Sequence, residues 1–143
     1  MYQKDYILRM IEMLGELLAA IFGLIKKGNY IQASQSLERA YYNLLKEEAS
    51  FFRRIKRDEL TEKLIRDHNY TNSHLEILAE LFYAEAELKY AKDNKEESIE
   101  FYEKSLILFE FVENNSKSYS LDRQSKQSSI QKRIIQLKGS MAG

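Results

Sequence analysis

The sequence predicts an all-α protein of about five to six amphipathic helices, packed as antiparallel hairpins. The 143 residues include no proline and only five glycines, two of which lie in the last five positions. Proline and glycine are the main helix breakers, so their scarcity favours long helices. Hydrophobic residues make up 44% of the chain and recur at helical spacing, which is enough for a hydrophobic core.

The first helix is expected from about residue 3 to residue 27. Its apolar side chains form a seam with a period of 3.5 residues, at Ile7, Ile11, Leu14, Leu18, Ile21 and Ile25. The polar face of this helix stops at Glu16, and the small residues Ala19 and Gly23 continue it. Residues 17–25 are therefore apolar on all sides, and a helix of that kind must be covered all round.

Breaks in the helical pattern divide the rest of the chain. Gly28 and Asn29 end the first helix and begin a second, expected from about residue 30 to residue 52. Asp58 is expected to cap a shorter third helix, and residues 68–73, reading HNYTNS, are expected to form the clearest loop. A fourth helix then extends to about residue 92. After a turn at residues 93–94, a fifth helix extends to about residue 113.

One helical domain is expected over residues 1–143, with residues 1–113 as its main body. Residues 114–129 are rich in Ser, Lys and Gln, so we expect a mobile polar linker there. Residues 130–138 are expected to form a C-terminal capping helix, with an apolar surface made by Ile130, Ile134, Ile135 and Leu137.

Two turn-plus-helix segments resemble each other. The first starts at residues 28–29 and the second at residues 93–94. Each places a small residue, a large residue four positions later and a small residue three positions after that, namely Ala33, Leu37 and Ala40 in the first and Ser98, Tyr102 and Ser105 in the second. This pattern is similar to the second half of a tetratricopeptide repeat, whose small residues let paired helices pack closely. The resemblance covers about residues 10–113 and implies a tetratricopeptide-like right-handed array or bundle. The two units are 65 residues apart, not 34, and neither ends in proline.

The segment DYILRMIE at residues 5–12 resembles the opening of an uncharacterised bacterial family, a domain of unknown function. That resemblance implies a bacterial source and no known activity.

Charge is balanced overall but unevenly distributed. Residues 76–113 carry four basic and eleven acidic side chains, and residues 114–143 carry six basic and one acidic. We expect these segments to attract each other within the fold. The alternative is a basic tail for nucleic acid, but at zero net charge the long-range attraction to nucleic acid is weak.

Several classes of site are disfavoured. The chain has no cysteine, and His68 and His74 are six residues apart, which does not match the spacing of helical metal pairs. The glutamates between residues 80 and 103 are expected to form a solvated acidic face. No nucleophile elbow or phosphate loop is present. We therefore expect no cofactor, no metal and no enzyme activity. The longest apolar run has nine residues, short of the roughly 20 that span a membrane, so a cytoplasmic protein is expected.

Aromatic and basic residues supply the candidate partner-binding site. Tyrosine and arginine are enriched at protein interfaces, so the candidates are Tyr41, Tyr42, Tyr83, Tyr90, Arg53 and Arg54. The alternative is that the aromatic rings fill the core and the arginines lie at a solvated helix end. The leading hypothesis is a non-enzymatic protein–protein interaction module of unknown partner. The alternatives are a small helical enzyme or ligand-binding protein with an acidic internal pocket, and a nucleic-acid-associated adaptor.

The first helix supplies a candidate homodimer interface, at Gly15, Ala19, Phe22 and Gly23. The small residues would allow close approach of a second helix, and the 3.5-residue seam suits a near-parallel helix pair. The competing interpretation is that the last helix folds over this surface and leaves a monomer.

Overall fold

The structure, a computed structural model, describes residues 2–116 and 120–142 and contains only helices in these ranges. The all-α prediction is confirmed. The helices, including one short 3-10 helix η1, are α1 (Tyr2–Lys26), α2 (Tyr30–Leu45), α3 (Ala49–Arg53), η1 (Arg57–Glu59), α4 (Leu60–His68), α5 (Asn72–Ala91), α6 (Lys95–Asn115) and α7 (Leu121–Ala142).

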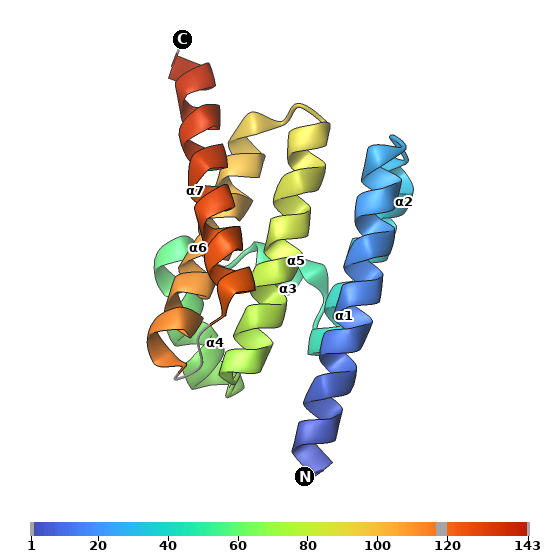
Figure 1. Cartoon of the computed structure of the whole chain (residues 1–143), viewed down its shortest axis with the longest axis vertical. Coiled ribbons are helices and arrows are strands. Elements are labelled where there is room, and N and C mark those ends of the chain that lie inside the picture. Colours follow the sequence, from blue (N-terminus) through green and yellow to red (C-terminus); the bar gives the residue numbers. More distant parts are fainter. Residues whose placement is uncertain (1, 117–119, 143) are drawn as a thin grey trace.

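Two antiparallel hairpins form the frame. The pair α1–α2 turns at Gly28 and the pair α5–α6 turns at Asp93, as the sequence predicted. Gly28 has a φ of 80°, a conformation that costs glycine little because it has no Cβ. Figure 1 shows α1 and α2 along one side, α5 in the middle, and α6 and α7 along the opposite side, with α7 in front.

Small residues bring the helices of each hairpin together. Ala33 and Ala40 on α2 and Ser98 and Ser105 on α6 are all completely buried. The Ser98 hydroxyl donates a hydrogen bond to the Ala86 carbonyl at 2.9 Å, and the Ser105 hydroxyl donates to the Ala79 carbonyl at 2.7 Å. Each buried hydroxyl is thus satisfied on the neighbouring helix, and α5 and α6 can approach closely.

One hydrophobic core joins the hairpins and includes residues from every α-helix. Phe82 of α5 is completely buried, with its ring centroid 6.4 Å from that of Tyr41 on α2 and 5.7 Å from that of Phe101 on α6. The centre of the core is therefore an aromatic cluster between the two hairpins.

The second helix ends earlier than predicted. Lys46 adopts a left-handed conformation, with a φ of 62°, and ends α2 at Leu45. A five-residue helix, α3, follows where the sequence predicted continuous helix to residue 52. This break places α3 beside α2 and creates the groove described below.

The mobile linker predicted at residues 114–129 is wrong over most of its length. Helix α6 continues to Asn115, and α7 starts at Leu121; residues 117–119 lie outside the described residues. Polar residues dominate the start of α7, but Arg123 is buried and Lys126 is partly buried against α5 and α6. Contacts with distant acidic residues therefore stabilise a helix that the local composition did not predict.

None of the described helices is long and apolar enough to cross a membrane.

Candidate functional site

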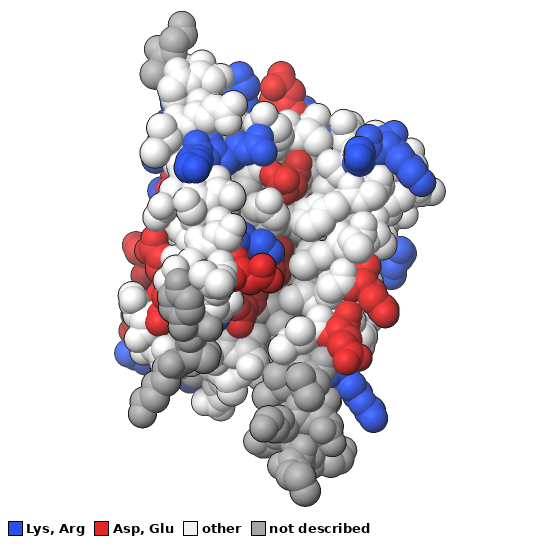
Figure 2. All heavy atoms as spheres, in the orientation of Figure 1, with Lys and Arg blue, Asp and Glu red and all other residues white. Residues whose placement is uncertain are grey.

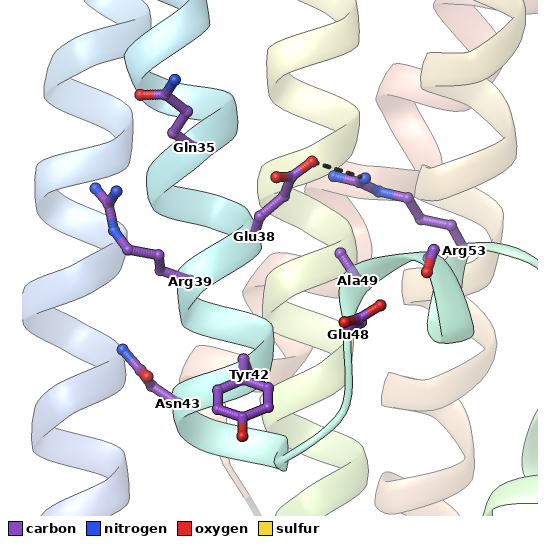
Figure 3. Close-up of a pocket in the computed structure, with 9 residues that line it drawn as sticks. Gln35, Glu38, Arg39, Tyr42, Asn43, Glu48, Ala49 and Arg53 are labelled. Atoms are coloured by element: carbon purple, nitrogen blue, oxygen red, sulfur yellow. Dashed lines mark hydrogen bonds and ion pairs between the residues drawn. The ribbon is translucent and has the colours of Figure 1, made fainter.

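A hollow with a volume of about 750 Å³ lies on the surface between α2 and α3. We call it the α2–α3 groove. It is lined by Gln35, Glu38, Arg39, Tyr42, Asn43, Glu48, Ala49, Ser50 and Arg53. Figure 3 shows Glu38 of α2 and Arg53 of α3 pointing toward each other, with Tyr42 near the end of α2.

One face of α2 forms a wall of this groove. Gln35, Glu38 and Tyr42 line it at spacings of three and four residues, and Ile31, which is outside the lining, extends the same helical stripe by one turn. This face points away from the core: Ile31 is 78% exposed and Tyr42 is 58% exposed. The stripe therefore offers an aromatic ring and an apolar side chain to solvent.

Arg53 links the groove to the protein interior. Its Nε donates a hydrogen bond to the Glu85 carboxylate at 2.6 Å, while its Nη1 lies 3.4 Å from the Glu38 carboxylate on the groove wall. Burial raises the pKa of the Glu85 carboxyl, and Arg53 opposes that rise. Burial also lowers the pKa of Arg53, but the attraction of Glu85 outweighs it and the net shift is upward. The ion pair therefore fixes the guanidinium at the groove.

The main chain of α3 is fixed as well. The nearly buried Lys104 of α6 donates a hydrogen bond from Nζ to the Arg53 carbonyl oxygen at 3.0 Å. The same ammonium group lies 5.8 Å from the centroid of the Phe82 ring and 5.5 Å from that of Phe101. Burial lowers the pKa of Lys104. This contact ties α3 to the aromatic centre of the core.

Glu85 is not on the solvated acidic face that the sequence predicted, because its side chain is only 1% exposed. The signal in the sequence was its position: it lies three residues after Phe82 and three before Leu88, both buried, and so belongs to the apolar stripe of α5. Its carboxylate pairs with Arg53. Glu38, the partner of Arg53 on the groove wall, was not predicted from the sequence.

The prediction that Tyr41 belongs to a partner-binding site is wrong. Tyr41 is completely buried, stacks on Phe52 with 5.6 Å between ring centroids, and has a pKa raised well above its usual value by burial. Its neighbour Tyr42 points about 100° away around the helix and is exposed. The core alternative therefore holds for Tyr41 and not for Tyr42.

Arg54 lies apart from the groove. It is exposed, and its Nε donates a hydrogen bond to the Ser50 carbonyl, at the start of the same short helix, at 3.2 Å. Of the two arginines, only Arg53 belongs to the groove lining.

Tyr83 and Tyr90 are located on a different surface, where α5 meets α7. The Tyr83 ring packs edge-on against Phe22 of α1, with 5.9 Å between centroids, and Lys126 Nζ of α7 lies 5.3 Å from its centroid. The guanidinium carbon of Arg133 lies 4.0 Å from the Tyr90 centroid. The six candidates therefore do not form one site, and only Tyr42 and Arg53 come together.

The acidic segment and the basic tail meet along this same surface, as predicted. Lys126 pairs with Glu80 at 2.6 Å, and Lys138 pairs with Glu103 at 3.1 Å. Arg123 pairs with Glu76 at 3.1 Å and with Glu113 at 2.5 Å. The hydrogen bond from Arg123 lowers the pKa of Glu113, whereas burial raises the pKa of Glu80. Figure 2 shows acidic and basic atoms close together on this face, which weakens the case for nucleic acid.

Both histidines have structural contacts. His68 lies edge-on to Phe51, with 4.7 Å between ring centroids, and His74 caps the start of α5. Within the described residues, no group of three or more His, Asp or Glu side chains is placed to hold a metal ion.

Comparisons with protein-family models, curated proteins and solved structures find no match to this chain. The resemblances to tetratricopeptide repeats and to an uncharacterised bacterial family therefore stay predictions.

The candidate dimer residues divide into two groups. Gly15, Ala19 and Gly23 are exposed, and a Cβ added at either glycine would meet nothing within 4 Å. Phe22 is partly buried against Tyr83. Helix α7 lies along α6 and leaves the three small residues uncovered, so the alternative in which the last helix covers them is wrong.

The 3.5-residue seam of α1 is mostly used inside the chain. Leu14, Leu18 and Ile21 are buried against α2 and α5, while Ile11 is 52% exposed at the edge of the seam. The seam therefore builds the core, and the surface that α1 leaves free is a different one.

Proposed function

We propose that this chain is a non-enzymatic protein–protein interaction module that holds a peptide segment of another protein in the α2–α3 groove. One observation carries the proposal. Tyr42, 58% exposed, and Arg53, fixed by a buried carboxylate, belong to the lining of one open groove of about 750 Å³. Tyrosine and arginine are the side chains that most often dominate protein interfaces.

The lining favours a peptide without net charge. Two basic side chains, Arg39 and Arg53, are balanced by two acidic ones, Glu38 and Glu48. The amides of the groove and the Ser50 hydroxyl offer donors and acceptors that match a peptide backbone. A Tyr ring supplies a large contact area at a small entropy cost because it has few rotatable bonds.

Pre-organisation strengthens the proposal. The ion pair with Glu85 and the hydrogen bond from Lys104 hold Arg53 in place before any partner arrives. Little side-chain entropy is then lost on binding. Glu38, at 3.4 Å from Arg53 and exposed on the groove wall, is weakly held and can exchange with a carbonyl of the partner.

The alternatives have less support. An enzyme with an acidic internal pocket needs converging carboxylates, but Glu85, the buried carboxylate, is already paired with Arg53. An adaptor for nucleic acid needs free cations, but Arg123 and Lys126 of the tail are engaged with acidic residues. No observation on this chain favours either of them.

The experiment compares Tyr42→Ser with Tyr6→Ser, a matched control on α1 that is 51% exposed and does not line the groove. Proteins retained by the full chain from its native host are identified by mass spectrometry, and the binding of the purified partner is then measured by calorimetry. Tyr42→Ser should weaken binding about tenfold or more, and Tyr6→Ser should leave it unchanged. A host extract with no specific partner, or a partner that binds both variants equally well, would overturn the proposal.

The proposal includes self-association of the chain as a homodimer through α1. The exposed small residues Gly15, Ala19 and Gly23 support it, and two-fold dimers are the commonest soluble oligomers. Light scattering at several concentrations tests it. Ala19→Glu should split the dimer and leave the helix content intact, and a mass of one chain at the highest concentration would reject self-association.

A further inference from the structure

We infer that two copies of this chain associate through α1 in antiparallel orientation, about a two-fold axis at Ala19. The inference rests on the proposed self-association and adds the orientation and the register. The surface involved, which we call the outer face of α1, consists of Glu12, Gly15, Ala19, Gly23 and Lys26.

The outer face is a single stripe that the fold leaves free. Its residues follow each other at spacings of three, four, four and three, so they lie within one sector of a helix with 3.6 residues per turn. All five are exposed, whereas Leu14, Leu18 and Ile21 point to the opposite side and are buried. A second chain can therefore reach the outer face without disturbing the core.

The stripe is complementary to itself only when the helices are antiparallel. In a pair centred on Ala19, residues equally distant from position 19 face each other, so Gly15 meets the partner's Gly23 and Glu12 meets the partner's Lys26. Two-fold symmetry repeats both contacts. A parallel pair in register would instead place Glu12 against Glu12 and Lys26 against Lys26, and such like-charge pairs are unfavourable.

The small side chains of the outer face favour the same pairing as its charges. At Gly15 and Gly23 there is open space where a Cβ would be, so the backbones can approach to about 8 Å, the close end of the usual range for helix packing. Beside the stripe, Ile11 is 52% exposed and adds apolar area to the contact. The small centre allows close packing, and the charged ends set the orientation.

The charges at the two ends of the outer face have no ion-pair partner in the part of the chain that the structure describes. Glu12 and Lys26 form no ion pair among the described residues, whereas Arg123, Lys126 and Lys138 of α7 are paired with acidic residues of α5 and α6. Figure 2 shows basic atoms at the upper end of α1 and acidic atoms over its lower half, with a further basic side chain below them. Along the outer face itself, Glu12 lies at one end and Lys26 at the other, which is the arrangement that an antiparallel pair requires.

The association should be modest in strength. One pair of helices buries less than the roughly 800 Å² per partner of a standard interface. We therefore expect a dimer that forms with a dissociation constant in the micromolar range or above, and that is best followed by sedimentation from about 10 µM to about 1 mM.

Charge exchange on the full chain tests the register. Glu12→Lys alone, or Lys26→Glu alone, places like charges together at both ends and should raise the dissociation constant about tenfold at low salt. The double variant Glu12→Lys with Lys26→Glu restores opposite charges and should return the constant to near the original value. Glu110→Lys, the same change at an exposed site on α6, is the control and should have no effect. Circular dichroism verifies that each variant folds.

The outcomes separate the inference from the proposed function. Single variants that weaken the dimer, with recovery in the double variant, support the antiparallel register. If the single variants have no effect, or if the double variant fails to recover, the register is wrong, although a dimer that Ala19→Glu still splits would keep the proposed self-association. A wild-type chain that stays monomeric at the highest concentration overturns both. The peptide-binding proposal for the α2–α3 groove is tested independently by Tyr42→Ser.

Discussion

Arg53 is the residue that connects the groove to the core, and its two carboxylate partners differ sharply in exposure. The Glu85 side chain is 1% exposed and the Glu38 side chain is 55% exposed. Removing one member of a buried pair leaves an uncompensated charge, whereas an exposed pair adds little stability. The contacts of Arg53 with Glu85 and with Glu38 should therefore contribute very differently to the free energy of unfolding.

We predict that Arg53→Met lowers the free energy of unfolding by about 3 kcal/mol, because Glu85 is left buried without its counter-charge. Glu38→Gln should change it by about 0.5 kcal/mol or less. Urea denaturation of the two variants measures both values. Equal losses would show that Arg53 contributes through its aliphatic stem and not through the buried pair.

His74 closes the capping box at the start of α5. Its backbone N–H donates a hydrogen bond to the Thr71 hydroxyl at 3.4 Å, and its Nδ1 accepts one from the Thr71 N–H at 3.2 Å. Only a neutral imidazole has a nitrogen that can accept. Burial lowers the pKa of His74 below the ordinary value of 6.5. The unfolded chain therefore takes up the proton more readily than the folded chain does.

Because the pKa of His74 is lower in the folded chain than in the unfolded chain, we predict that the neutral His74 side chain contributes fully to the free energy of unfolding above pH 6.5. This contribution is lost as the pH falls through the lowered pKa of the folded state. His74→Gln keeps an acceptor at the same capping position and should remove this part of the pH dependence. Thermal melts between about pH 5 and pH 7.5 measure the slope. His68→Gln is the control, and it should keep the slope of the wild type; a slope unchanged in His74→Gln would refute the assignment.

Among the helices, α7 shows how a polar element can be part of a core. It buries Ile130, Ile134 and Leu137, and its Lys126 and Lys138 pair with acidic side chains of α5 and α6. The apolar contacts do not depend on salt, while the exposed ion pairs are screened by it. The attachment of α7 should therefore have one component that salt weakens and one that it does not.

We predict that a chain ending at Ser116 is less stable than the full chain, since burial of each of the three aliphatic side chains contributes roughly 1.5–3 kcal/mol. Added salt should reduce part of the difference in melting temperature between the two chains. Ile135→Ser is the control, because Ile135 is 72% exposed and its loss should leave the melting temperature unchanged. If the shortened and full chains melt together in low and in high salt, α7 contributes nothing to the fold.

At the scale of the whole molecule, each α-helix in the described part of the chain contributes to one core. Helices that share a core lose their contacts together when one of them unfolds, and single domains under 150 residues usually unfold in one step. The interior polar contacts, such as Lys104 to the Arg53 carbonyl, also cross between elements far apart in sequence.

We predict a single cooperative unfolding transition in urea. Ellipticity at 222 nm reports the helices, and the fluorescence of the ten tyrosines, which include the buried Tyr41 and Tyr102, reports the tertiary packing. The two signals should give the same midpoint and the same slope. An early transition seen only in the ellipticity would mean that α1 or α7 unfolds separately from the rest.

The sequence by itself determined the local features of this protein. The absence of proline, the helical spacing of apolar residues and the turns at Gly28 and Asp93 predicted an all-α chain with two hairpins, because each depends on residues close together in the chain. The attraction between the acidic segment and the basic tail was predicted too, since net charge needs only composition.

The tertiary structure alone decided the site. Tyr41 and Tyr42 are adjacent and have the same chemistry. Because α2 packs against α5, Tyr41 is buried in the core, while Tyr42 is exposed in the groove. The pair of Arg53 with Glu85 spans 32 residues, and that of Lys126 with Glu80 spans 46. Neither is visible in a local pattern, because a buried charge and a polar helix are stable only where distant residues supply their partners.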